Sequence, residues 1–352
     1  MSENERTFPA LRLHPWRYLP ILIILGLVVH LLVPQIAALE KSWAVIQAMT
    51  WWVVILAIVA QVLSYVGSGY MLHTIMAINQ QKLSTLKGIL ITMAANSIGL
   101  VAGGWVGGDA ATFGWVRQET HDGNDAALAS TLPTMLNNVI LAVVSGIGVI
   151  YLLAIHDLSQ GQLLGFSVVL LLICLLMAGA VATFRYPEPA TRLAVKLSGR
   201  WAKMRHKAFQ PQDTMVSVQR FIQSWQSLGH GRWMRPALGA LANTGFDMLT
   251  LYLMFIAAGH RVRPGVLFAG YGLPYMLGKI AFVFPGGVGV VEAGMVALYG
   301  SLGVPNEVSA VVILGYRLIS FWIPSLLGFA AAAYLGSGAS KSKESQSPVS
   351  LG

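Results

Sequence analysis

The chain has 352 residues, of which 55% are hydrophobic and only 11% are charged, and its formal net charge is +9. A soluble domain carries about 25% charged residues, so this composition excludes a large soluble catalytic domain and predicts a polytopic membrane protein. In such a protein an excess of Lys and Arg marks the cytoplasmic loops, and we therefore expect no nucleic-acid partner.

Apolar segments recur along the whole chain, and a bilayer core needs roughly 20 apolar residues for each helical crossing. The polar stretch 1–17 before the first segment is expected to be a cytoplasmic tail. The stretch 337–352, rich in Ser, Gly and Lys, is expected to be a disordered tail. The apolar segments lie at 18–39, 44–76, 87–103, 126–155, 161–184, 235–259, 264–284, 288–303 and 306–336.

The distribution of positive charge sets the expected topology. Basic residues concentrate in the linker 185–234, which we therefore place on the cytoplasmic side together with both termini. Counting the spans back from the cytoplasmic linker, we expect the segment 87–123 to enter and leave the membrane from the cytoplasmic side. The segment 264–303 enters and leaves from the outside, although Arg261 and Arg263 depart from the charge trend there.

This topology predicts an all-α fold with about six full spans and two broken re-entrant hairpins. The two membrane halves, 18–184 and 235–336, would then form an inverted repeat. Short segments interrupted by Gly or Pro at corresponding places of two halves are typical of a transporter's binding site. The alternative is a set of eight ordinary spans in which the glycines serve packing.

The basic linker contains an amphipathic pattern. Arg192, Lys196 and Arg200 recur every four residues, and an apolar residue follows each of them. One interpretation is an interfacial helix whose cations reach anionic headgroups. The other is a cytoplasmic loop that happens to be helical. A second helix is expected to begin near Asp213, which is a suitable N-cap residue.

Charged side chains inside apolar segments are few, and such residues mark transport pathways or ion pairs. Asn243 lies one turn before one of these charges, and Tyr316 directly precedes another. For each residue alone, a structural salt bridge or hydrogen bond is an alternative to ligand contact, but together they indicate a lined cavity. The charged residues are Asp109, Arg117, Asp247, Lys279, Glu292 and Arg317.

Two glycine-rich breaks interrupt the apolar segments, "GGWVGGDAA" and "FPGGVGVVEAG". Glycine lets backbone amides approach a ligand closely, and helices that restart near Asp109 and Val290 would direct their positive ends into the breaks. Asp109 and Glu292 each admit two interpretations, as a helix cap or as a group that contacts ligand or couples ions. The backbone positions expected to bind substrate are Gly107, Gly108, Pro285, Gly286, Gly287 and Gly289.

Motifs of soluble enzymes are missing. The sequence has no phosphate-binding P-loop, no H-E-x-x-H and no G-x-S-x-G, and its histidines show no metal-ligand spacing. We therefore expect no catalytic residue, no cofactor and no metal. Two alternatives stay open: an intramembrane enzyme acting on a lipid phosphate with Asp247 or Glu292 as base, and an accessory subunit that presents lipid to a lipid-modifying partner enzyme.

Three blocks carry a family resemblance: "WVGGDAATFGWVRQE", "FPGGVGVVEAGMVALYG" and "GYRLISFWIPSLLG". Over residues 18–336 the chain resembles the lysylphosphatidylglycerol synthase transmembrane-region family, which includes the flippase half of the bacterial multiple peptide resistance factor. The resemblance implies a flippase that moves a phosphate-bearing lipid across a bacterial-type cytoplasmic (inner) membrane. That lipid would be an anionic or aminoacylated phospholipid, or a polyprenyl-phosphate-linked one. The sequence departs from the full resistance factor in lacking a soluble aminoacyl-transferase domain, so synthase activity is not expected.

Overall fold

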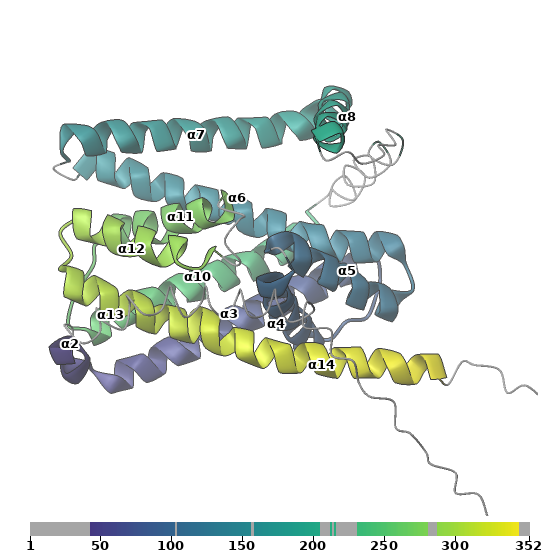
Figure 1. The fold of residues 1–352 in the computed structure, drawn as a ribbon, viewed down its shortest axis with the longest axis horizontal. Coiled ribbons are helices and arrows are strands. Elements are labelled where there is room, and N and C mark those ends of the chain that lie inside the picture. The colour runs from purple at the N-terminus through teal and green to yellow at the C-terminus, as the bar shows by residue number, and fades with distance from the viewer. Residues whose placement is uncertain are drawn as a thin grey trace, which may run out of the picture.

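Long apolar helices dominate the fold. The computed structural model describes residues 43–102, 104–155, 158–204, 212, 215, 231–280 and 287–344, and over these residues the chain is helical (Figure 1). The expected first segment, 18–39, lies outside this part. The helices long and apolar enough to cross a membrane are α3 (Trp51–Ile78), α6 (Gly123–Ile155), α10 (Met234–Ala257) and the run 306–336 within α13 (Asn306–Arg317), η3 (Leu318–Trp322) and α14 (Ile323–Glu344). The protein is thus a multi-pass membrane protein whose secondary structure, over the described residues, is all helical.

Helices α3 and α10 pack against each other at the centre of the molecule, and glycines permit their close approach. A Cβ atom at Gly67 would lie 2.6 Å from the backbone nitrogen of Asn243, and one at Gly239 would lie 2.7 Å from the Cα of Met71. Ser64 Oγ donates to the Asn243 carbonyl oxygen at 2.9 Å. Small residues and interhelical hydrogen bonds of this kind hold helices together inside membranes, where burial of apolar surface contributes little.

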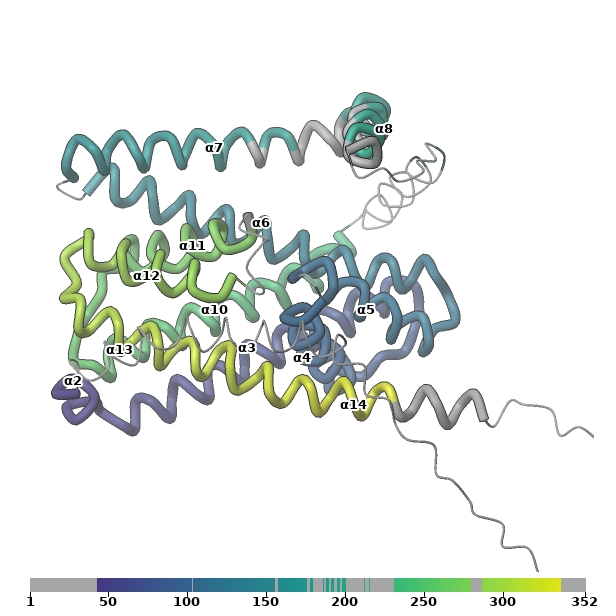
Figure 2. The backbone as a smooth tube through the Cα atoms, in the orientation of Figure 1, coloured from purple at the N-terminus to yellow at the C-terminus, as the bar shows by residue number. Residues whose placement is uncertain are grey.

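Two helical hairpins lie at opposite ends of this pair. One consists of α4 (Thr85–Val101) and α5 (Trp105–Thr120), and the other of α11 (Pro264–Ile280) and α12 (Val290–Ser301) (Figures 1 and 2). Helix α4 packs against α14, and helix α11 packs against α6. Each hairpin therefore lies on a long helix that belongs to the other half of the chain.

The break in the first hairpin lies earlier than the sequence suggested. Helix α5 begins at Trp105, after Gly104 with a φ of 71°, and not near Asp109. Gly107 and Gly108 are therefore helical. They lie within α5 because only glycine fits where this helix packs closely against α4 and the residue that follows it. A Cβ atom at Gly107 would lie 2.3 Å from the Ala102 carbonyl oxygen, and one at Gly108 would lie 2.9 Å from the Ala95 carbonyl oxygen. In the second hairpin the helix restarts at Val290, as predicted.

The remaining helices lie outside this core. Helix α7 (Gln160–Arg185) packs against α6, and α8 (Pro187–Met204) follows it, while the short α2 (Trp43–Ala48) precedes α3. The expected second linker helix near Asp213 lies outside the described residues. Helix α14 continues to Glu344, so the expected disordered tail from residue 337 begins too early. An established helix adds residues at little cost, which is why the segment up to Glu344 extends it.

Candidate functional site

A cavity of about 390 Å³ lies between the two hairpins and the long helices. Its walls come from α3, α4, α5, α6, α10 and α11 and from the segment around η3. Many of the residues that the sequence singled out meet here, although they are far apart in the chain. The predicted residues that line the cavity are Gly108, Asp109, Asn243, Asp247, Lys279, Gly287 and Arg317.

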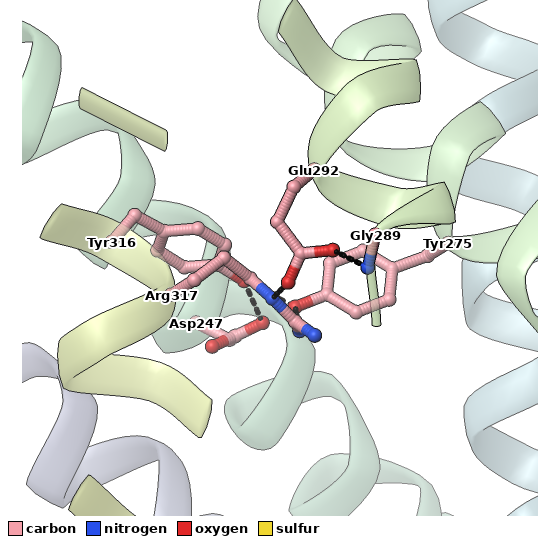
Figure 3. A network of polar contacts seen from close by, with 6 residues as sticks. All are labelled: Asp247, Tyr275, Gly289, Glu292, Tyr316 and Arg317. Carbon is pink, nitrogen blue, oxygen red and sulfur yellow. Dashed lines mark hydrogen bonds and ion pairs between the residues drawn. The ribbon is translucent and has the colours of Figure 1, made fainter. Parts of the chain in front are cut away.

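A buried ion pair joins the second hairpin to the last long helix. Arg317 Nε donates to Glu292 Oε1 at 2.7 Å, and the two side chains are only 2% and 5% exposed. The other carboxylate oxygen of Glu292 accepts the backbone N–H of Gly289 at 2.7 Å (Figure 3). Glu292 therefore caps α12 and also neutralises Arg317, so the structure combines the cap with an ion pair.

Tyrosine hydroxyls extend this pair to Asp247. Arg317 Nη1 donates to Tyr275 Oη at 3.4 Å, and the Tyr275 and Tyr316 hydroxyls lie 2.7 Å apart. Tyr316 in turn donates to Asp247 Oδ2 at 2.7 Å (Figure 3). Because Tyr316 gives its only proton to Asp247, Tyr275 must be the donor between the two tyrosines. In this series of hydrogen bonds, each group therefore donates to the next one, from Arg317 through Tyr275 and Tyr316 to Asp247.

Several polar atoms around the cavity lack a partner among the residues that the structure describes. Arg317 Nη2 is a buried, charged donor of this kind, and Gln61 Oε1 and Asn137 Oδ1 are buried acceptors. The guanidinium of Arg317 also lies 4.0 Å from the centre of the Phe321 ring. Because buried polar groups are normally hydrogen-bonded, these atoms indicate a site that receives a polar ligand.

A second charged pair lies in the part of the cavity next to the first hairpin. Thr134 Oγ1 donates to Asp109 Oδ1 at 2.9 Å, so Asp109 does not cap its helix. Lys279 Nζ donates to Asn138 Oδ1 and attracts the Asp109 carboxylate. Unlike the Arg317–Glu292 pair, Asp109 is only half-buried and Lys279 is exposed. This pair is therefore accessible from the cavity.

Other expected binding positions are occupied or lie elsewhere. The Gly108 amide donates to the Gly104 carbonyl oxygen at 3.2 Å, and the Gly289 amide is taken by Glu292, so neither amide is free for a ligand. Gly107 is buried in α5 and is not among the residues around the cavity. The predictions of ligand-facing amides at these three glycines are therefore wrong, because helix formation and capping use or bury those groups.

Another prediction concerns a described position that lies away from the cavity. Arg117 is exposed in the last turn of α5, where its guanidinium lies 6.0 Å from the centre of the Phe113 ring, and it does not line the cavity. Its assignment to the site is wrong because the restarted helix carries it away toward the end of the molecule. Pro285 and Gly286 lie outside the described residues.

The sequence reasoning missed a polar stripe on α3. Gln61, Ser64, Tyr65 and Ser68 all line the cavity, and their spacing of three, one and three residues places them on one helical face. That periodicity within an apolar segment was the signal that could have revealed them. Tyr275 was also missed, although it follows Tyr271 by one helical turn.

A turn of π-helix lies next to Arg317. It spans Leu318–Trp322 and precedes Pro324, which has no backbone N–H to donate to the Ser320 carbonyl. Tyr65 from the polar stripe donates its hydroxyl to that carbonyl oxygen at 3.4 Å. Local irregularities of this kind are frequent at functional sites, and here the irregular turn carries Ser320 and Phe321 into the cavity wall.

Comparison with known proteins agrees with this architecture. The family model described as "Lysylphosphatidylglycerol synthase TM region" matches residues 19–328. The chain belongs to this family. A UPF0104 membrane protein of Pyrococcus horikoshii is 24% identical over 322 residues, which cover 88% of this chain and 94% of that protein.

Two shorter matches have higher sequence identity. A UPF0104 membrane protein of Methanothermobacter thermautotrophicus is 37% identical over 95 residues, or 27% of this chain and 28% of that protein. A UPF0104 membrane protein of Methanocaldococcus jannaschii is 30% identical over 86 residues, which cover 24% of this chain and 25% of that protein. The description of the family names the synthase of a membrane lipid.

Proposed function

We propose that this family member is a lipid flippase, which moves a phosphate-bearing lipid across the membrane through the cavity between its hairpins. The observation that carries the proposal is Arg317, whose buried Nη2 lacks a partner among the described residues at the cavity wall. A guanidinium N–H is a strong donor to phosphate oxygens. In this proposal the headgroup phosphate binds Arg317 while the acyl chains stay in the surrounding lipid.

The proposed membrane arrangement has two re-entrant hairpins in an inverted repeat. It is supported by the position of hairpins α4–α5 and α11–α12 at opposite ends of the α3–α10 pair (Figure 1). The cross-packing of α4 on α14 and of α11 on α6 also supports it. Both termini would lie in the cytoplasm of a cell whose inner membrane holds the protein, following the positive-inside distribution. Movement of one half against the other would then alternate access to the cavity.

The charges of the site favour a headgroup that carries both a negative and a positive charge, or one with many hydroxyl groups. Two cations, Arg317 and Lys279, face three carboxylates, Asp109, Asp247 and Glu292. A phosphate at Arg317 therefore leaves Asp109 and the unpartnered Asn137 Oδ1 available for donors on the same headgroup. An aminoacylated phospholipid supplies an ammonium, and a polyprenyl-phosphate-linked sugar supplies hydroxyl groups. We propose transport and not chemistry, because the two carboxylates considered as bases, Asp247 and Glu292, are held in one hydrogen-bonded chain with Arg317.

The test is lipid transfer in vesicles that contain the purified protein and a fluorescent phosphatidylglycerol. The double variant Glu292→Gln/Arg317→Gln removes the buried pair without leaving one charge alone, and we expect it to abolish protein-dependent transfer. Arg117→Gln removes an exposed arginine outside the cavity and is expected to keep full activity. Equal transfer by wild type and the double variant would overturn the site.

Lipid analysis of the same vesicles by mass spectrometry separates transport from catalysis. A flippase leaves the lipid chemically unchanged, whereas an intramembrane enzyme converts it with time. Transfer without conversion supports the proposal, and conversion that depends on Asp247 or Glu292 replaces it with the enzyme. Absence of both activities for every phosphate-bearing lipid tried would leave the accessory role as the better explanation and contradict the flippase.

A further inference from the structure

Helix α8 lies crosswise to the long helices. Helix α7 runs alongside α6, and the chain then turns so that α8 extends across the direction of α7 (Figures 1 and 2). It lies at the end of the molecule at which hairpin α4–α5 begins and ends. Because the long helices cross the membrane, a helix crosswise to them at one end runs along the membrane surface.

The exposed face of α8 is basic. The helix Pro187–Met204 contains Arg192, Lys196, Arg200 and Lys203 and a single acidic residue, Glu188. The first three cations are exposed, and their spacing of four residues places them on one face. The function proposed above does not use this face.

The cations of α8 are available to a partner. Arg192 contacts Glu188 at 3.3 Å, but the two side chains are 79% and 83% exposed, and an ion pair this exposed is weak. Thr191 is buried and Val195 is half-buried, so a neighbouring face of the helix is the one turned toward protein. In the sequence each of the three exposed cations is followed by an apolar residue. A basic helix with an adjacent apolar stripe is the composition of helices that bind membrane surfaces.

We propose that α8 is an interfacial helix that binds anionic phospholipid headgroups on the membrane face where hairpin α4–α5 opens. In this arrangement the cations at 192, 196 and 200 contact the phosphates. This contact anchors the linker between the two halves of the chain to one leaflet. It does not depend on lipid transport, so failure of either proposal leaves the other intact.

Hydrogen exchange measured by mass spectrometry on the full-length protein tests the contact. The protein is placed in nanodiscs of phosphatidylcholine alone, or of phosphatidylcholine with phosphatidylglycerol. We expect the amides of Pro187–Met204 to exchange roughly tenfold more slowly in the anionic nanodiscs, because basic residues near an anionic surface are held there electrostatically. High salt should remove the difference, because it screens the attraction.

Two matched double variants make the test specific. Lys196→Gln/Arg200→Gln should abolish the dependence on phosphatidylglycerol, whereas Arg261→Gln/Arg263→Gln, which removes two exposed arginines elsewhere, should preserve it. Unchanged protection of α3 and α10 shows that each variant is folded. Exchange in α8 that is the same in both nanodiscs would overturn the proposal. The proposal would also be overturned if α8 stayed protected from exchange in the Lys196→Gln/Arg200→Gln variant, because that protection would come from contact with protein.

Discussion

Asp109 and Glu292 have the same sequence spacing from a positive-φ glycine and from the side chain that donates a hydrogen bond to them. Each lies five residues after a glycine with positive φ, which is Gly104 at 71° in one hairpin and Gly287 at 67° in the other. Each also accepts a hydrogen bond from a side chain 25 residues further along the chain. The two carboxylates thus share these spacings but not their place in the helix, because Glu292 is the third residue of α12 and caps it, whereas Asp109 is the fifth residue of α5 and does not.

The partners of these two carboxylates differ in charge. Glu292 faces a guanidinium and is buried, whereas Asp109 faces the hydroxyl of Thr134 and is half-buried. Lys279, which attracts Asp109, comes from the other half of the chain. One carboxylate is therefore locked into the protein, and the other remains accessible from the cavity.

The Glu292–Arg317 pair should show strong coupling in a double-mutant cycle. Arg317→Met leaves a buried carboxylate without its cation, and breaking a buried pair in this way costs about 3–5 kcal/mol. Glu292→Gln alone also destabilises, because it leaves the buried guanidinium unneutralised. The double variant should be more stable than the sum of the single losses implies, as measured by denaturation in detergent. Simple additivity would show that the two side chains do not act as a pair.

Asp109→Asn should impair transport much more than folding. Asparagine still accepts the Thr134 hydrogen bond, so we expect the unfolding free energy to change by no more than about 1 kcal/mol. The accessible negative charge is lost, and we expect the lipid transfer rate to fall about tenfold, equivalent to about 1.4 kcal/mol. Asp122→Asn, at an exposed turn, is the control. An Asp109→Asn protein that transfers lipid at the wild-type rate would remove Asp109 from the site.

Alanine at Gly104 and at Gly287, which both have positive φ, should cost different amounts. At Gly104 a Cβ would meet no atom within 4 Å, so Gly104→Ala costs only the strain of a backbone conformation (φ 71°, ψ −141°) that is nearly restricted to glycine, about 1–3 kcal/mol. At Gly287 the Cβ would also lie 3.1 Å from Val291 Cγ2 and 3.2 Å from Gly278 Cα, so the loss should be larger. Gly114→Ala, in open space on a helix, should be neutral or stabilising. Thermal unfolding gives the order, and equal losses at 104 and 287 would contradict it.

Tyr65 and Pro324 should be coupled through the Ser320 carbonyl. Tyr65→Phe removes the hydroxyl that reaches this oxygen and should destabilise the protein by about 1 kcal/mol. In a Pro324→Ala background the backbone regains an N–H that can bond to Ser320, so Tyr65→Phe should then cost clearly less. Chemical denaturation of the four proteins measures both losses. The same loss in either background would mean that the hydroxyl does not substitute for the missing amide.

The sequence predicts the architecture better than the contacts of the site. Charge asymmetry and apolar length indicated both hairpins, and the restart at Val290 is confirmed. The restart near Asp109 is wrong because "GGWVGG" contains two glycine pairs, and local propensity does not decide which pair forms the break. The break falls at Gly104, because Gly107 and Gly108 pack closely against Ala102 and against Ala95 within α4.

Pairing within the site required the folded structure. Asp247, Glu292 and Arg317 stood out as charges in apolar segments, but the tyrosine chain that joins them comes from different helices. Sequence spacing gives the face of one helix and does not give the register between two. The polar stripe on α3 could have been predicted from the helical periodicity of the sequence, because all its members belong to a single helix.

The cross-packing of the hairpins has a consequence for how the protein is made. Hairpin α4–α5 leaves the ribosome early, but its packing partner α14 is the last helix that the structure describes. During synthesis the first hairpin must therefore wait in the membrane with its α14-facing surface uncovered. Neither half of the chain can complete its own packing alone, so we expect the two halves to be stable only when they are present together.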